Sequence, residues 1–197
     1  MIGPKDKLSR REGFDLFGKG AKLTRLTVPP GVHGPKGSFR SPSQYGRQLR
    51  EKQKAKRLYG IKERQFKRYV EEALKTRTNT ADALFSNLER RLDNVVFRLG
   101  FVKTRPQARQ LVSHRHVLVN NQKLNIPSYK TRKGETISLD KKALEIPSVK
   151  KELENKDKKV PAWLKRKGAV GLVVKEPTFA EITEPISAQD IIEFYSR

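Results

Sequence analysis

The chain has 197 residues, of which 44 are Lys or Arg and 21 are Asp or Glu, so its formal net charge is +23. A metabolic enzyme rarely carries so much charge of one sign, because self-repulsion opposes the folded state unless a polyanion offsets it. The chain has no cysteine, which excludes disulfides, thiolate metal sites and cysteine nucleophiles. No run of 18 apolar residues predicts a membrane span, and the first residues do not resemble a secretory signal.

The positive charge is concentrated in the first 150 residues. Residues 1–90 carry 22 basic and 9 acidic residues, and residues 91–150 carry 13 and 4, whereas residues 151–197 carry 9 and 8. An excess of this size is typical of proteins that bind nucleic acid, and less often of proteins that bind anionic membranes. A surface that is basic only for solubility normally mixes both signs. We therefore expect the first 150 residues to face a polyanion.

Residues 1–40 show no sustained helical or strand period. Their glycines and prolines are interleaved with basic residues, and such a composition does not bury enough apolar surface to order itself. We therefore expect an extended basic N-terminal segment that becomes ordered by lying on a partner.

A strongly basic helix is predicted next. Ser41 and Pro42 suit its start, and Gly60 suits its end after Tyr59. Few of its residues are apolar, so we expect this helix to pack on something other than a hydrophobic core, namely phosphate. Its basic residues lie three or four apart along one side: Arg47, Arg50, Lys54 and Arg57.

Two conventional amphipathic helices follow. Apolar residues at helical spacing predict one helix over about 62–76 and a longer one over about 81–99. Asn79 or Thr80 suits the start of the longer helix, and Gly100 suits its end.

The longer helix has an apolar stripe with two arginines beside it. The stripe comprises Leu84, Phe85, Leu88, Leu92, Val95, Val96 and Leu99. Arg91 and Arg98 lie just outside one edge, where we expect them to lean on the core and present their guanidinium groups outward. Asp93 is explained more simply as a partner for nearby arginines than as a general base.

A short helix over 105–113 is predicted from the capping-box spacing of Thr104 and Gln107. Arg105 and Arg109 are four residues apart on this helix and so share a face. With Arg91 and Arg98 they are expected to form one RNA-binding patch.

After this helix the apolar period changes to two, which indicates a small antiparallel sheet. Strands are predicted at 116–119, 123–126 and 136–139, with a tight turn at Asn120-Asn121 between the first two. Residues 141–160 are either a helical connector or a solvated linker. A strand at 171–174 and a final helix capped by Ser187 complete the chain.

The histidines do not predict a metal site. His114 and His116 flank Arg115, and in a strand this spacing places both rings on one face. A metal needs a third ligand, and none is adjacent. Contact with RNA is the better explanation for this tripeptide, with simple surface placement as the alternative. No nucleophile elbow or phosphate-cradling glycine loop is present, so we expect no catalytic activity and no cofactor.

Several ordered motifs resemble a known family. The segment from Arg91 to His114 resembles the RNA-binding module named after small-subunit ribosomal protein four. Motifs along the rest of the chain resemble bacterial-type ribosomal protein four itself: residues 9–13, 30–34, 49–54, 63–66 and 193–197. The resemblance covers nearly the whole chain.

The resemblance implies an α+β fold in which a mainly helical first domain carries an inserted RNA-binding module. That module is a helix-turn-helix with a small antiparallel sheet. The expected division is an extended basic segment at 1–40, a helical domain at 41–90, the inserted module at 91–150, and a C-terminal segment at 151–197 that returns to the helical domain.

The family resemblance also implies a function in the cytoplasm, within the small ribosomal subunit. Family members bind 16S-type ribosomal RNA directly at a multi-helix junction in the 5′ domain and nucleate assembly of the subunit body. They act with ribosomal proteins five and twelve in translational accuracy, and with proteins three and five they line the channel through which mRNA enters. No membrane contact and no homo-oligomer are expected.

The family motifs add site residues to those found by spacing. Arg10 and Arg11 belong to the N-terminal motif, and Lys36 and Arg40 are the nearest matches to the basic residues of the mRNA channel. The expected RNA-binding residues are Arg10, Arg11, Arg47, Arg50, Lys54, Arg57, Arg91, Arg98, Arg105, Arg109, His114, Arg115 and His116. Many family members bind zinc through N-terminal cysteines, but Asp6 and Ser9 stand at the first pair's positions here. The resemblance thus implies a zinc-free form.

Other functions remain as alternatives. An RNA-modifying enzyme could use the module as an anchor, although the rest of the chain lacks a catalytic motif. A nonspecific packaging protein would bind any duplex or single strand of the same length equally well. Binding to the protein's own mRNA occurs in some family members, and the sequence does not decide it.

Overall fold

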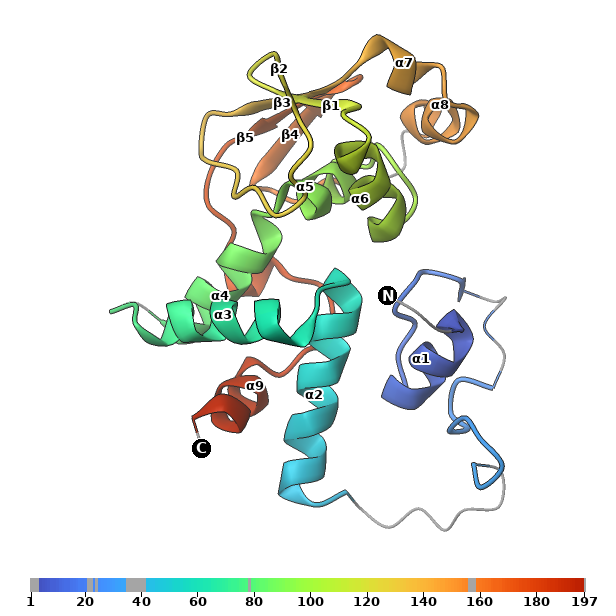
Figure 1. Ribbon diagram of the computed structural model, residues 1–197, viewed down its shortest axis with the longest axis vertical. Coiled ribbons are helices and arrows are strands. Elements are labelled where there is room, and N and C mark those ends of the chain that lie inside the picture. Colours follow the sequence, from blue (N-terminus) through green and yellow to red (C-terminus); the bar gives the residue numbers. More distant parts are fainter. Residues whose placement is uncertain are drawn as a thin grey trace. The chain divides into compact units, whose positions relative to one another are not determined.

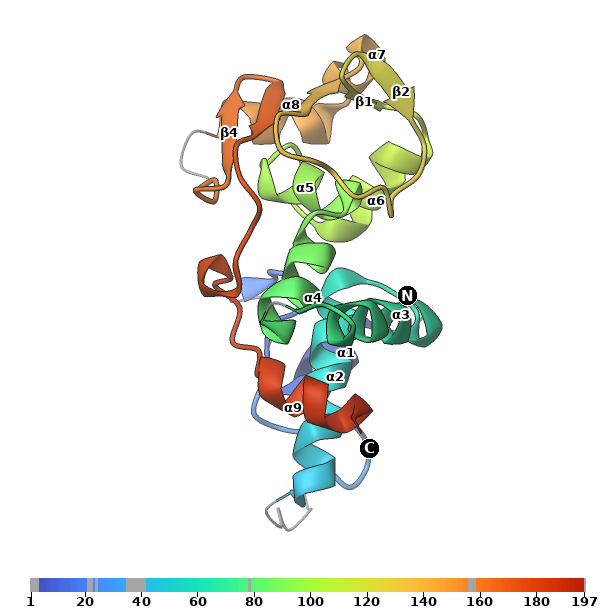
Figure 2. The same ribbon diagram turned by 90° about the vertical axis from the view of Figure 1, so that its left-hand side faces the viewer.

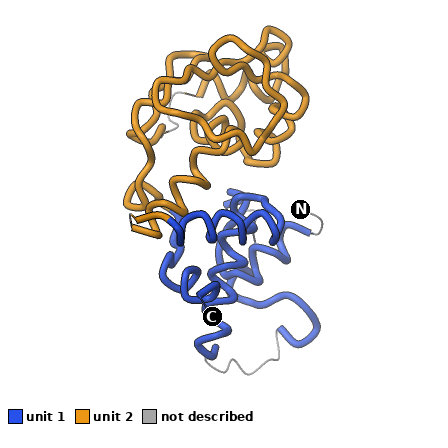
Figure 3. The backbone as a smooth tube through the Cα atoms, turned by 60° about the vertical axis from the view of Figure 1, so that its left-hand side comes forward, with its two compact units in different colours: residues 1–75, 184–197 blue, residues 76–183 orange. Residues whose placement is uncertain are grey.

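The computed structural model describes residues 4–20, 23, 25–34, 42–77, 79–155 and 159–196. The chain divides into two compact units, one formed by residues 1–75 with 184–197 and the other by residues 76–183 (Figure 3). Each unit is described by itself. No helix in the described part of the chain is long and apolar enough to cross a membrane.

The first unit is helical. Its helices are α1 (Lys5–Glu12), α2 (Gln44–Tyr59), α3 (Glu63–Leu74) and α9 (Ala188–Tyr195) (Figure 1). The hydroxyl of Ser43 accepts a hydrogen bond from the Gly46 N–H and caps α2, whereas the predicted cap, Ser41, lies outside the described residues. Gly60 ends α2 in a left-handed conformation with φ 65°, as predicted.

Helix α1 corrects the expectation that residues 1–40 lack regular structure. It spans eight residues and ends at Gly13, whose φ is 63°. Leu16, just beyond it, is buried. The sequence pattern missed this helix because polar contacts order it: Arg50 and Arg57 of α2 both reach the carboxylate of Glu12.

Helix α9 packs against α2 in the first unit (Figure 2). The amide Nε2 of buried Gln48 donates to Glu193 at 2.7 Å, and the N–H of Ser187 donates to Glu51 at 3.0 Å. Ser187 also caps α9 by accepting from the Asp190 N–H, as predicted. The expectation that α2 packs on phosphate instead of protein is therefore wrong on this side, because α9 covers it.

The second unit is α+β. Its elements are α4 (Thr80–Glu89), α5 (Leu92–Arg98), α6 (Arg105–Ser113), β1 (Val117–Val119), β2 (Gln122–Leu124), β3 (Thr136–Leu139), α7 (Lys141–Leu144), α8 (Pro147–Glu154), β4 (Leu164–Lys167), β5 (Val170–Val173) and the short 3-10 helix η2 (Phe179–Glu181). Asn79 caps α4 through its side chain, and the stretch 141–154 holds the two short helices α7 and α8 with a turn at residues 145–146 between them.

The predicted single helix over 81–99 is broken between α4 and α5. Its apolar stripe is buried as predicted, but the backbone hydrogen bonds at the break go to a distant segment. The N–H of Leu92 donates to the Tyr129 carbonyl at 2.9 Å, and the N–H of Thr131 donates to the Arg90 carbonyl at 2.8 Å. Side-chain periodicity does not reveal such a break, because both helices keep their apolar faces in register.

The sheet has five antiparallel strands in the order β2-β1-β3-β5-β4. Asn120 and Asn121 have φ values of 48° and 65°, as the tight turn between β1 and β2 requires. Strand β4 was not predicted, because Leu164 is its only apolar residue. One face of the sheet shares a core with α5 and α6 that includes Leu99, Phe101, Ile137 and Trp163.

The two compact units meet in the sequence at 75/76 and 183/184, whereas the sequence predicted domain boundaries at 90/91 and 150/151. Strands β4 and β5 pair with each other, and β5 pairs with β3, so residues 164–173 complete the sheet of the module. Only residues 184–197 belong to the helical unit. The change in charge balance after residue 150 does not mark the end of the second unit, because the near-neutral residues 151–197 are shared between the two units.

Candidate nucleic-acid interface

Helix α6 carries one of the exposed cations predicted in the second unit, Arg109. Thr104 caps the helix, and its buried residues are Ala108, Leu111 and Val112, as predicted. Arg109 lies beside this buried face, and its side chain is 51% exposed and lies 3.7 Å from the carboxylate of Asp93. At that distance and exposure the pair is weak, and the guanidinium of Arg109 is available to a phosphate.

Arg105 is held in place by neighbouring groups. Its Nε donates to the Asn94 side-chain oxygen at 2.9 Å, and its guanidinium carbon lies 4.4 Å from the ring centroid of Phe97. Asn94 in turn donates to the carboxylate of Glu89 at 2.8 Å. This chain of contacts orients one arginine at the edge of α6, which reduces the entropy lost when it binds a ligand.

Arg91 and Arg98 do not present their guanidinium groups outward, so this expectation is wrong. Arg91 is 1% exposed, and it binds both oxygens of Asp93 at 3.1 and 2.7 Å. Arg98 binds both oxygens of buried Glu89 at 2.9 and 2.7 Å. A buried carboxylate needs a paired cation, and these arginines supply the pairing. The prediction of Asp93 as an arginine partner is confirmed.

The tripeptide after α6 is a turn, not the start of a strand. His114 ends α6, Arg115 has a φ of 61°, and β1 begins only at Val117. His114 and Arg115 are exposed, while His116 is half-buried. The two rings nevertheless lie 6.2 Å apart between centroids. In the described part of the chain, no three His, Asp or Glu side chains form a metal-binding group.

The predicted stripe on α2 is largely used inside the first unit. Arg47 is exposed, but Arg50 lies 3.4 Å from Glu12, and Arg57 also pairs with Glu12. Lys54 lies 3.3 Å from Glu51. The four basic residues share a side as predicted, yet three of them bind carboxylates of the same unit.

Glu12 is a buried carboxylate between α1 and α2, with its side chain 0% exposed. Burial raises its pKa, and the two arginines oppose that shift. Its second oxygen, Oε2, has no hydrogen-bond partner among the described residues. An ion pair that is only partly satisfied holds α1 against α2, so this contact is sensitive to protonation.

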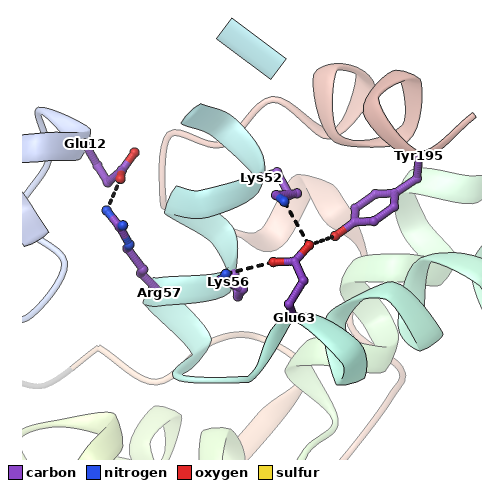
Figure 4. A network of polar contacts seen from close by, with 6 residues as sticks. All are labelled: Glu12, Lys52, Lys56, Arg57, Glu63 and Tyr195. Atoms are coloured by element: carbon purple, nitrogen blue, oxygen red, sulfur yellow. Dashed lines mark hydrogen bonds and ion pairs between the residues drawn. The ribbon is translucent and has the colours of Figure 1, made fainter. Parts of the chain in front are cut away.

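A second network joins α2, α3 and α9 around Glu63 (Figure 4). Lys52 donates to Glu63 at 2.8 Å, Lys56 at 2.7 Å and the hydroxyl of Tyr195 at 2.6 Å. Burial alone would raise the pKa of Glu63, but these three donors lower it to about 2. Burial and the bond to Glu63 raise the pKa of Tyr195.

The two N-terminal arginines differ: Arg10 is bound within the protein and Arg11 is exposed. Arg10 is bound to backbone carbonyls, with Nε 2.8 Å from Val28 O and one terminal nitrogen 3.1 Å from Pro29 O. Arg11 is exposed and remains available to a ligand. Lys36 and Arg40, the residues matched to the mRNA channel, lie outside the described residues.

Sequence reasoning missed two basic residues near α6 and the sheet. Lys103 is exposed just before α6. Arg166 of β4 donates to the carbonyls of Leu99 and Leu153 at 3.1 Å each, and so binds the ends of α5 and α8. Strand β4 consists of Leu164 followed by three basic residues, so no alternating apolar period marked it in the sequence.

Comparisons with known proteins cover both units. Residues 1–89 match the model described as Ribosomal protein S4/S9 N-terminal domain, and residues 90–137 match the S4 domain. The chain is 48% identical to small ribosomal subunit protein uS4 of Aquifex aeolicus, covering all of this chain and 98% of that protein. The uS4 protein of Thermus thermophilus is 43% identical over 100% of this chain and 98% of its own length. The uS4 protein of Sulfurihydrogenibium is 47% identical over 99% and 98%.

Proposed function

We propose that this chain, which belongs to the uS4 family of small ribosomal subunit proteins and carries its S4 RNA-binding domain, binds 16S-type ribosomal RNA directly at a multi-helix junction in the 5′ domain. Membership of the family makes the chain a constituent of the small subunit and not an enzyme. The junction, the direct contact and the role in assembly are the proposal.

The observation that carries the proposal is the exposed basic face of α6 and the turn that follows it. Arg109 and Arg115 are exposed, and Arg105 is oriented by Asn94 and Phe97. This face lies within residues 90–137, which match the S4 domain. Folded RNA is read largely by shape, through contacts to phosphates and 2′-hydroxyls, and a rigid basic helix face suits that mode of recognition.

Affinity in this mechanism comes mainly from counterion release. Each phosphate neutralised by a Lys or Arg contributes about −0.7 to −0.9 to the slope of log affinity against log salt. Arg91 and Arg98 are engaged in ion pairs within the protein. We therefore expect them to position the basic face of α6 and not to add to the slope of log affinity against log salt.

We further propose that the chain is a primary binder that nucleates assembly of the subunit body. In this role it acts with ribosomal proteins five and twelve in translational accuracy. With proteins three and five it lines the channel through which mRNA enters, using Lys36 and Arg40. Family membership supports these roles, and the contacts of Lys36 and Arg40 lie outside the described residues.

A competition assay tests the proposal. Purified protein is titrated with the 5′ domain of small-subunit ribosomal RNA and with a scrambled RNA of the same length, across a series of salt concentrations. We expect a preference for the 5′ domain that persists near physiological salt, in the range of about 10³-fold that specific sites show over nonspecific ones. Equal binding that collapses with salt for both RNAs would instead support nonspecific packaging.

A further inference from the structure

A pocket of about 360 Å³ lies in the first unit, between α1, the loop at residues 30–31 and α2. A volume of this size is within the range of sites that hold small ligands. The residues that matter for its chemistry are Pro4, Lys7, Leu8, Arg11, Pro30 and Arg57. All the described residues that line the pocket belong to the first unit.

Helix α1 supplies one wall of the pocket through a single helix face. Pro4, Lys7, Leu8 and Arg11 follow the spacing i, i+3, i+4, i+7, which places their side chains in one stripe. The stripe alternates apolar and basic residues. It therefore offers an apolar floor with cations directly beside it.

The facing walls are fixed before any ligand arrives. Arg10 binds the carbonyls of Val28 and Pro29 at 2.8 and 3.1 Å, which holds the loop that continues into Pro30. Arg57 is held by its ion pair with Glu12. A pocket whose walls are tied down loses little entropy when it is filled.

The charge of the pocket is positive. Among its described lining residues none is acidic. Lys7 and Arg11 are exposed, and neither makes a salt bridge within the described part of the chain. Cations next to an apolar floor match the two chemistries of a nucleotide, which are an anionic phosphate and a largely apolar base and ribose face.

We propose that this pocket holds one unstacked nucleotide of the ribosomal RNA, with base and ribose against Pro4, Leu8 and Pro30 and with the phosphate on Lys7 and Arg11. The inference rests on the proposed function, because the RNA supplies the ligand. Bases in loops and bulges are free to leave the stack, and it is mostly such unstacked bases that proteins contact when they recognise a particular RNA sequence.

The test is a missing-nucleoside experiment on the 5′ domain RNA. RNA from which single nucleosides have been removed at random is partitioned on the wild-type protein, and the bound and free fractions are sequenced. We expect one position whose loss weakens binding by about fivefold, the low end of the effect of one stacked base, because the described floor of the pocket is aliphatic and not aromatic. The Leu8→Glu variant, which replaces the apolar floor with a carboxylate, is expected to bind about tenfold more weakly and to lose this signal.

Two further variants serve as a charge control and as a second test of the pocket. Gln44→Glu introduces the same charge at an exposed position outside the pocket and is expected to retain the signal. Arg11→Gln changes an exposed side chain, so it tests the pocket even if Leu8→Glu fails to fold. We expect Arg11→Gln to weaken binding and to reduce the cost of losing that nucleoside.

Three outcomes would overturn the inference while leaving the proposed function intact. One is a preference for the 5′ domain with no position sensitive to nucleoside loss. Another is a sensitive position that Leu8→Glu and Arg11→Gln leave unchanged. The third is weaker binding by Arg11→Gln without any nucleoside signal, which indicates a bare phosphate. A wild-type protein that does not prefer the 5′ domain would remove both proposals.

Discussion

Helices α2 and α6 carry basic residues at the same helical spacing but use them in different ways. On α2, Arg50 and Arg57 bind the buried carboxylate of Glu12 from a neighbouring helix. On α6, Arg109 is 51% exposed and approaches a carboxylate only to 3.7 Å. Spacing places cations on one side of a helix, but the acids that the fold brings to that side decide whether they remain available to RNA.

The two arginines at the ends of helix α5 are engaged by carboxylates more completely than those of α2. Arg91 and Arg98 bind Asp93 and Glu89 through two contacts each, and Arg91 is 1% exposed. The guanidinium groups of these arginines are engaged inside the module, next to α6. The module therefore has two layers of arginine, a buried one that is paired with carboxylates and a more exposed one that we propose binds RNA.

The largest expected effect is on the buried layer. Arg91→Met leaves the buried carboxylate of Asp93 with only the weak contact to Arg109 at 3.7 Å, which costs about 3–5 kcal/mol in the free energy of unfolding. Urea unfolding monitored by circular dichroism measures the change. RNA affinity at a temperature where the variant is folded is expected to stay unchanged.

The double variant Arg91→Met with Asp93→Asn serves as the control, because it removes both charges of the pair. We expect it to recover part of the lost stability, since no unpaired charge remains. A folded Arg91→Met protein that binds RNA much more weakly would contradict the assignment of Arg91 to the scaffold.

The second effect concerns the exposed layer. Reversing the charge at Arg105 and Arg109 together is expected to weaken binding to the 5′ domain RNA by at least about tenfold, because phosphate contacts become repulsive. Arg109→Glu alone should change the free energy of unfolding by less than about 0.5 kcal/mol, since its side chain is exposed. Filter binding and thermal unfolding measure the two quantities.

A charge reversal elsewhere in the same unit provides the reference. Lys142 of α7 is exposed, and Lys142→Glu changes the net charge by the same amount as Arg109→Glu. Equal losses of affinity for these two single variants would mean that only overall charge matters, and the distinction between α6 and other surfaces would fail.

The smallest expected effect is on the pH dependence of stability, to which two carboxylates of the first unit, Glu63 and Glu12, are expected to contribute in opposite directions. The pKa of Glu63 is lowered to about 2 from 4.5, so its stabilising contribution is present above pH 4.5 and is lost as the pH falls toward 2. Because this carboxylate is partly exposed, we expect a contribution of about 1 kcal/mol after screening. Chemical unfolding of wild type and Glu63→Gln between pH 6 and about pH 3 should show curves that converge at the acidic end.

Glu12 is expected to show the opposite sign. Burial raises the pKa of Glu12, so this carboxyl takes up a proton more readily in the folded state than in the unfolded chain. Lowering the pH therefore favours folding through Glu12. The Glu12→Gln variant lacks this group and is expected to lose that contribution. Parallel pH profiles for Glu12→Gln and Glu63→Gln would contradict the contrast between the two sites.

Apolar periodicity predicted the packing well. Every residue of the stripe from Leu84 to Leu99 is buried, as are Phe66, Tyr69, Val70 and Ala73 of α3. Leu74 is the exception at 42% exposed, because α3 ends there. Caps with local hydrogen bonds, at Thr104 and Ser187, were also predictable, since both partners lie within four residues of each other.

The features that sequence reasoning missed depend on distant partners. The break between α4 and α5 is set by hydrogen bonds to residues 129 and 131, helix α1 by ion pairs with α2, and strand β4 by pairing with β5. Whether a predicted RNA-binding arginine is exposed also depends on residues distant from it in the sequence. Arg91 and Arg109 look equivalent in the sequence, and only the acids near each of them distinguish the two.

The order of the chain has a consequence for its synthesis. Residues 76–183 form a continuous unit, whereas the first unit needs residues 184–197 to complete it. Gln48, Lys52 and Glu63 find their partners Glu193, Phe194 and Tyr195 only when the last residues have been made. Because nascent chains fold as their units become complete, the RNA-binding module finishes folding before the helical unit that precedes it in the sequence.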